Sequence, residues 1–141
     1  MRDVYETLRC CKYFIDNEFL KKYCQIIERH SSRQPKYYMI HKHHIIPRSW
    51  FKLCKLAVDD SIANLVRLPT REHFLAHYYL CLCTEDPFKY CNQLALICLL
   101  SSKEINSVDK QLLQRLPMYN NIYEELTLKQ KSNYQIYTEE L

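Results

Sequence analysis

The segment of residues 64–77 has the sequence Asn64-Leu65-Val66-Arg67-Leu68-Pro69-Thr70-Arg71-Glu72-His73-Phe74-Leu75-Ala76-His77. Its first five residues are typical of a short strand, and the proline that follows stops that strand. Thr70 is a natural N-cap for a helix that we expect to run to about Cys83. The segment therefore predicts a short strand followed directly by a helix.

Four of the six histidines occur as two close pairs, and one pair belongs to this helix. His73 and His77 are four residues apart, so they lie on one helix face and their imidazoles can converge on one metal ion. His43 and His44 follow the aromatic-rich residues 37–40, which predict another short strand. Because neighbours on a strand point to opposite faces, one of this pair can complete a three-histidine site while the other accepts a proton. The pattern alone leaves open which of the two is the ligand.

The rest of the chain is expected to be mostly helical. Apolar residues recur every three or four positions from Asp3 to about His30, the period of one amphipathic helix. Residues 45–63 have no regular period, and we expect most of them to form an ordered loop. Three further helices are expected, at residues 88–100, where the helix should be buried, at 107–116 and around 122–126. The predicted fold class is α+β, with helix dominant.

A chain of 141 residues has the usual size of one domain, so we expect a single core over residues 1–141. Its parts are an N-terminal helix within 1–35, a core at 36–84 that contains both histidine pairs, and a helical region at 85–141. Glycine is absent, which excludes the glycine-rich phosphate loops, and we expect no nucleotide cofactor. Tight turns must use other residues, such as Asp59-Asp60 or Asn120-Asn121.

Apolar runs and cysteines bear on the cell compartment. The longest apolar run, residues 94–100, is far too short to cross a bilayer, and the N-terminus lacks the apolar region of a signal peptide. We therefore expect an intracellular protein with no membrane partner. The eight cysteines include no Cys-x-x-Cys pair and are expected to be reduced and mostly buried. Cys81, one helical step beyond His77, could be a fourth ligand, but a closed site would block catalysis and we expect it in the core.

Positive charge is concentrated in the middle of the chain. The net charge is +4, and residues 36–84 alone carry seven basic and three acidic side chains, whereas residues 85–141 carry six and eight. A basic face by itself is a weak indication of a polyanionic partner, because solvated basic surfaces are common. Here the basic part of the chain is also the part that contains both histidine pairs.

Three segments in this order resemble the HNH endonuclease family: His43-His44-Ile45-Ile46-Pro47-Arg48-Ser49, Asn64-Leu65-Val66-Arg67-Leu68 and Arg71-Glu72-His73-Phe74-Leu75-Ala76-His77. The chain looks most like the free-standing HNH homing endonucleases of phages and other large DNA viruses, which share their core with colicin DNases and the HNH domain of CRISPR effectors. The resemblance covers roughly residues 37–83, and residues 120–126 are similar, with lower specificity, to the last segment of the phage enzymes. It implies a ββα-metal core, with DNA as the partner.

The resemblance also implies a role for each matching residue. His43, His73 and His77 would hold one divalent metal ion, and His44 would be the general base. Asn64 matches the asparagine that braces the loop between the strands and so holds the base in position. In the family, water attacks a DNA phosphodiester and the products carry 5′ phosphates. Three imidazole ligands favour zinc, nickel or cobalt, although such sites can also work with magnesium or manganese.

Three arginines lie close to these positions in the sequence. Arg48, Arg67 and Arg71 could each clamp a phosphate oxygen, and the sequence does not indicate which one does. The chain departs from the family pattern beside the first of them, where Trp50-Phe51-Lys52-Leu53 replaces the usual pair of glycines. The loop that leads from His44 to Asn64 is also several residues longer than is common.

Two other interpretations remain open. The histidines could hold a structural zinc in a DNA-binding or assembly module that breaks no bond, and a fourth protein ligand would support that interpretation. The same chemistry could also serve a toxin or a restriction nuclease. The target sequence, the choice between nicking and double-strand cleavage, and the oligomeric state are not indicated by the sequence.

Overall fold

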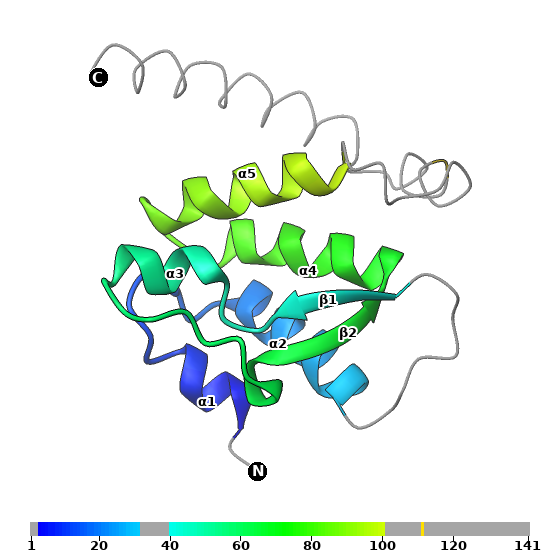
Figure 1. Ribbon diagram of the computed structural model, residues 1–141, viewed down its shortest axis with the longest axis horizontal. Coiled ribbons are helices and arrows are strands. Elements are labelled where there is room, and N and C mark those ends of the chain that lie inside the picture. Colours follow the sequence, from blue (N-terminus) through cyan, green and yellow to red (C-terminus); the bar gives the residue numbers. More distant parts are fainter. Residues whose placement is uncertain (1–2, 32–39, 101–110, 112–141) are drawn as a thin grey trace.

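A computed structural model gives the arrangement of the chain and describes residues 3–31, 40–100 and 111. Within these residues the fold is α+β, with five α-helices and a two-stranded antiparallel sheet (Figure 1). The elements in chain order are α1 (Val4–Leu8), α2 (Glu18–Ser31), β1 (Ile40–His44), α3 (Arg48–Leu53), a 3-10 turn (Ile62–Asn64), β2 (Leu65–Pro69), α4 (Thr70–Leu82) and α5 (Phe88–Leu100). The predicted order of strand, connection, strand and helix is confirmed.

The two strands pair so that one face is covered and the other is exposed. His43 lies opposite Val66, and Lys42 lies opposite Arg67. Because side chains alternate along a strand, each opposed pair shares one face of the sheet. His43 and Val66 are buried, whereas Lys42 and Arg67 are exposed. The strand register therefore directs His43 towards the interior and leaves a basic pair on the outer face.

Helix α4 lies between other elements in the packing. It contacts α5 on one side and α2 and both strands on the other (Figure 1). Its residues Phe74, Ala76 and Leu80 have no exposed surface. A helix that is covered from several directions has apolar residues around most of its circumference, as this one does. The helix that carries His73 and His77 is thus enclosed by its neighbours.

The single helix predicted from Asp3 to about His30 is wrong, because the structure has two helices separated by residues 9–17. The second helix, α2, starts afresh at an N-cap. Asn17 Oδ1 accepts hydrogen bonds from the backbone N–H groups of Phe19 (3.0 Å) and Leu20 (3.1 Å). This is the usual way in which an asparagine caps a helix N-terminus.

Contacts with the end of α4 hold the segment between α1 and α2. Asn17 Nδ2 donates a hydrogen bond to the backbone oxygen of Leu82 (3.0 Å), and Phe14 forms a bridge with Thr84. The backbone turns at Tyr13, where φ is +71°. These partners lie far away in the sequence, so the local apolar period does not reveal the break.

The connection between the strands contains a helix that was not predicted. Most of residues 45–63 were expected to form a loop, but Arg48–Leu53 form α3. Trp50 Nε1 donates a hydrogen bond to the backbone oxygen of Lys12 (2.8 Å), and Phe51 is buried. The helix is thus anchored by tertiary contacts at the position where the family pattern has glycines.

Helix α5 has the predicted bounds but is less enclosed than predicted. Phe88, Asn92 and Leu96, four residues apart on one face, are fully buried, whereas Cys98 is exposed. The expectation that this helix is buried therefore holds for one face, and not for the position of Cys98. One face packs against α4 and α3, as expected for a helix at the edge of the described fold.

Turns and cysteines also differ in detail from the predictions. Among the described residues, positive φ angles occur at Tyr13 and Lys55, and not at the Asp59-Asp60 pair. Thr70 is the first residue of α4, and Pro69 takes the N-cap position. No disulfide joins the eight cysteines, all of which lie within the described residues. Only three of them are buried, Cys24, Cys81 and Cys83, which is fewer than predicted.

Some predictions fall on parts of the chain outside the described residues. These are the start of the first strand at 37–39, the helices at 107–116 and around 122–126, the turn at 120–121 and the family likeness of 120–126. Within the described ranges, no helix combines the length and the apolar character needed to cross a membrane.

Candidate metal centre

His43, His73 and His77 converge at one point of the structure. Each offers a ring nitrogen, and these three atoms lie within 4.8 Å of one another. The Nε2 atoms of His73 and His77 are 3.0 Å apart, and the ring of His43 lies 5.0–5.3 Å from the other two rings. Among the described residues, this is the group of side chains that could hold a metal ion, and Cys81 is not part of it.

The backbone explains why these three side chains meet. β2 runs directly into α4 at Pro69, so His73 and His77 face back towards the sheet from the first turns of that helix. β1 pairs with β2, and the register places His43 on the face that α4 covers. His43 and the pair His73 and His77 are thus distant in the sequence, but the pairing of β1 with β2 and the direct passage from β2 into α4 bring their rings together.

Burial keeps the three imidazoles neutral. Loss of water, followed by the influence of His77, His73 and His44, holds the pKa of His43 well below its ordinary value. Burial, with smaller contributions from His77 and His41, lowers the pKa of His73 to about 2, and burial lowers that of His77 to about 4. Neutral imidazoles have the lone pairs that a metal ion requires. The donor group is thus ready to bind a cation near neutral pH.

Tyr23 of α2 orients the ring of His43. Its hydroxyl donates a hydrogen bond to the backbone oxygen of Ile45 (2.6 Å) and lies 2.7 Å from His43 Nε2. Because the hydroxyl proton is already used, His43 Nε2–H must be the donor in the second contact. The lone pair of neutral His43 then lies on Nδ1, free to face the other two histidines. Burial raises the pKa of Tyr23 well above its ordinary value, so the hydroxyl stays protonated.

His41 is a fourth histidine of the cluster, and the sequence reasoning missed it. Its Nδ1 lies 2.9 Å from Nδ1 of His73, on the opposite edge of that ring from the nitrogen that faces His77. If His73 offers Nε2 to an ion, its proton is on Nδ1 and can be donated to His41. His41 is two residues before His43, so strand alternation puts both on one face. That spacing was a signal that could have been used.

Replacement of His41 by alanine is expected to weaken metal binding by about 10–100-fold, the usual cost of removing a partner that orients a ligand. The direct ligands remain, but His73 loses the acceptor that fixes its tautomer. Isothermal titration with zinc would measure the change. Lys42→Ala is a matched control, because Lys42 is the next residue on the strand but faces outward. Equal zinc affinity of His41→Ala and the parent would contradict this role.

The metal-free protein is expected to lose stability as the pH falls from about 6.5 towards 4. The pKa values of His73 and His77 are lower in the folded protein than their ordinary 6.5. Between the two values the unfolded chain binds protons and the folded chain does not, so stability is complete above 6.5 and is lost below it. Each such histidine contributes up to about 1.4 kcal/mol per pH unit.

Denaturant unfolding in EDTA at a series of pH values would measure this effect. His77→Gln removes one of the titrating groups, so its stability should fall less steeply with pH than that of the parent. Identical slopes for the two proteins would mean that His77 is not held neutral by the fold.

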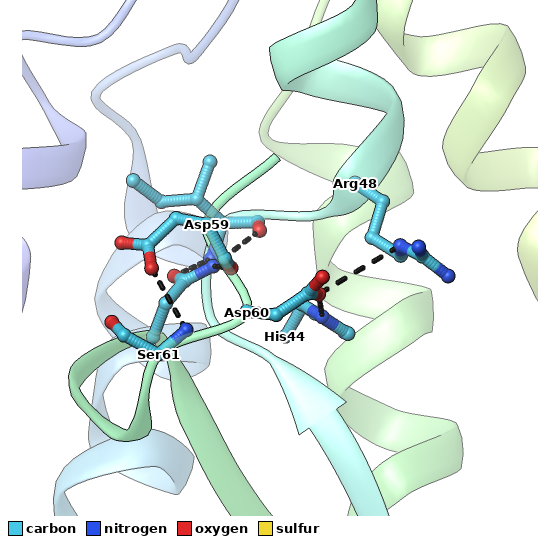
Figure 2. A network of polar contacts seen from close by, with 7 residues as sticks. His44, Arg48, Asp59, Asp60 and Ser61 are labelled. Atoms are coloured by element: carbon cyan, nitrogen blue, oxygen red, sulfur yellow. Dashed lines mark hydrogen bonds and ion pairs between the residues drawn. The ribbon is translucent and has the colours of Figure 1, made fainter. Parts of the chain in front are cut away.

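His44 lies on the other side of β1 and belongs to a separate polar network, shown in Figure 2. Its Nε2 is 2.7 Å from Asp60 Oδ1, and the Nε of Arg48 is 3.9 Å from the same carboxylate oxygen. His44 is about one-quarter exposed, so its ring is accessible to solvent, unlike that of His43. The two neighbouring histidines are thus directed to different partners, as the strand alternation predicts.

Asn64 ties the two ends of the connection between the strands. Its Oδ1 accepts a hydrogen bond from the backbone N–H of Ile46 (2.8 Å), and its Nδ2 donates to the backbone oxygens of Ile46 (3.1 Å) and Asp59 (2.9 Å). The side chain is buried, with all these groups satisfied. Asn64 therefore makes the loop-bracing contacts expected from the resemblance, next to the strand end that carries His44.

The three arginines differ in their surroundings. Arg48 joins the His44 network through Asp60, whereas Arg67 and Arg71 form no ion pair with other described residues. Arg67 lies beside Lys42 on the outer face of the sheet, and Arg71 is exposed in the first turn of α4. The structure thus brings one of the three next to His44.

Comparison of the chain with models of known protein families, with curated proteins and with solved structures returned no match. The function of the chain is therefore inferred from the residues of the site and from the resemblance of its sequence to the HNH endonucleases.

Proposed function

We propose that this protein is a metal-dependent DNA endonuclease of the HNH type, most similar to homing endonucleases of phages and large DNA viruses. The observation that carries the proposal is the convergence of His43, His73 and His77, with His44 next to His43 in the chain but directed to the other side of β1. Metal-dependent hydrolases use a bound ion to stabilise the charge that develops on the substrate and a separate side chain to take a proton from water.

The strand pair and α4 are the elements that this proposal interprets as a ββα-metal core. They follow one another in the chain as β1, β2 and α4, and each histidine of the proposed site comes from β1 or α4. Asn64 stands where the middle asparagine of the motif stands, and it binds the backbone at both ends of the connection. The sequence motif and the geometry thus support the same assignment.

His43, His73 and His77 would hold one divalent ion. Bound there, the ion would supply positive charge that stabilises the charge developing on a phosphate group. Neutral imidazoles favour zinc, nickel or cobalt over magnesium or manganese on grounds of ligand type. Tyr23 and His41 hold the His43 and His73 rings in the tautomers that leave a nitrogen lone pair for the ion.

His44 is the proposed general base, which takes a proton from the attacking water. Its ring is partly exposed, as a group that must meet substrate needs to be, and it is held at the end of β1 beside Asn64. Arg48 lies close enough to the same network to hold a phosphate oxygen with its remaining N–H groups. Lys42 and Arg67 on the outer face add charge for contacts along the DNA backbone.

The alternative function, a zinc-stabilised DNA-binding or assembly module, requires a closed site. A structural zinc usually has four protein ligands, whereas the described residues provide a group of three. That difference favours a site with room for water and substrate.

Incubation of supercoiled plasmid with the purified protein tests the proposal. The protein is first treated with EDTA and then supplied with zinc, nickel, cobalt, manganese or magnesium in separate reactions. We expect relaxed or linear DNA with 5′ phosphate ends in at least one of them, and no cleavage in EDTA. Tight binding of zinc without cleavage under any of these conditions would overturn the proposal in favour of the structural module.

A further inference from the structure

The long connection between the strands returns over His44 and brings a carboxylate to it. Asp60 Oδ1 lies 2.7 Å from His44 Nε2, although the two residues are 16 positions apart in the chain. We propose that Asp60 is a positioning residue for His44, which fixes the tautomer and the orientation of its ring. The inference depends on the proposed function, in which His44 is the base.

The chemistry of the contact determines where the proton lies. A carboxylate accepts hydrogen bonds and does not donate them, so the short contact requires a proton on His44 Nε2. A neutral imidazole with its proton on Nε2 has its lone pair on Nδ1. Asp60 thereby leaves Nδ1 as the nitrogen that can receive a proton from water. The same hydrogen bond prevents a half-turn flip of the His44 ring.

Asp60 is held in place by its neighbours on both sides. The backbone oxygen of Asp59 accepts a hydrogen bond from Asn64 Nδ2 (2.9 Å), and Asp59 Oδ1 accepts one from the backbone N–H of Ser61 (2.9 Å). Figure 2 shows the two aspartate side chains pointing apart, Asp60 towards His44 and Asp59 towards Ser61. The hydrogen bonds that Ser61 donates lower the pKa of Asp59 from its ordinary value.

These contacts connect Asn64 to His44 through the loop. Asn64 fixes the backbone at Asp59, and the next residue supplies the carboxylate that holds the imidazole. In this chain, these two contacts explain how Asn64 could brace the loop and so hold the His44 ring. It also gives a reason for the additional length of the loop, because residues 54–61 must leave α3 and return to the end of β1.

Arg48 is arranged by the same carboxylate. Its Nε lies 3.9 Å from Asp60 Oδ1, at the start of α3. Both partners are more than half exposed, at 60% and 59%, so the pair adds little to stability. The effect of this ion pair is to keep the guanidinium of Arg48 beside the proposed base, His44. The other N–H groups of the guanidinium take no part in the contact with Asp60.

The test compares Asp60→Ala with two controls in the full chain. Asp60→Glu keeps a carboxylate, and Asp59→Asn changes the neighbouring aspartate while keeping an oxygen that can accept from Ser61. The first readout is the nitrogen-15 NMR signature of the His44 ring, which distinguishes protonation on Nε2 from protonation on Nδ1 without any need for activity. The second is the rate of plasmid cleavage as a function of DNA concentration, and zinc affinity checks that the fold and the three-histidine site remain intact.

We expect the parent and Asp59→Asn to show a single tautomer with the proton on Nε2, and Asp60→Ala to show a mixture of both. The kcat of Asp60→Ala should fall by about 10–100-fold, the scale of an orienting partner, with little change in KM or zinc affinity. Asp60→Glu should recover part of the loss. An unchanged tautomer and an unchanged kcat in Asp60→Ala would overturn the inference while the nuclease proposal stands.

The two proposals can fail separately in this experiment. A parent protein that cuts no DNA with any of the metals would overturn the nuclease proposal, and with it the role of Asp60 in positioning a base. A parent that cuts DNA, together with an Asp60→Ala variant that cuts equally fast, would overturn only the role of Asp60.

Discussion

Replacement of His44 by alanine should lower the rate of DNA cleavage by about 10²–10⁴-fold, the usual contribution of a positioned base. The variant should still bind metal, because His43, His73 and His77 form their group on the covered side of β1 without His44. It should also bind DNA nearly as well as the parent, since the basic residues of the surface are unchanged.

Three measurements on His44→Ala separate these expectations: plasmid cleavage, isothermal titration with zinc, and gel shift of a short duplex. His30→Ala is a suitable control, because it also replaces a histidine with alanine, on α2 and outside both the metal-binding group and the His44 network. Parental cleavage by His44→Ala would mean that the base is another group.

Replacement of His77 by alanine should weaken zinc binding by more than about 100-fold, beyond the 10–100-fold typical of residues that only orient a ligand. The substitution removes a donor outright and leaves His73 Nε2 without the nitrogen that now lies 3.0 Å away. Cleavage should fall with metal binding, whereas the basic surface and its affinity for DNA should persist.

The two substitutions are therefore expected to differ in metal binding, although both lower the rate of cleavage. His44→Ala keeps the metal and loses the rate, and His77→Ala loses both, so chelator competition and the plasmid assay on the same preparations distinguish them. Loss of zinc by His44→Ala with retention by His77→Ala would show that the two roles are assigned wrongly. If both variants still cut DNA, the nuclease site lies elsewhere in the chain.

The parts of the fold that follow local rules were predictable from the sequence. Proline at position 69 separates a strand from a helix, and the four-residue spacing of His73 and His77 puts both on one helix face. Alternation along a strand separates His43 from His44. These rules concern neighbours within one element. They left open which of His43 and His44 joins the helix pair, and the choice of His43, which lies close to His73 and His77 in the structure, came from the resemblance to the HNH family.

Contacts between distant segments were not predictable in the same way. The break after α1 depends on Asn17 reaching the end of α4, 65 residues away, and α3 depends on partners such as Lys12. Tyr23 and Asp60 touch the histidine pair from 20 and 16 residues away, and neither has a sequence pattern of its own. His41 is a different case, because its position two residues before His43 on the same strand is enough to place both side chains on one face of the sheet.

X-ray absorption by zinc bound to the purified full chain, at one equivalent, tests most directly the claim that His43, His73 and His77 form an open metal centre. We expect three imidazole nitrogens at about 2.0–2.1 Å from the zinc, with oxygen from water completing the coordination shell and no sulfur at about 2.3 Å. A shell that contains a cysteine sulfur, or four protein ligands of any kind, would contradict an open catalytic site and would indicate a structural zinc.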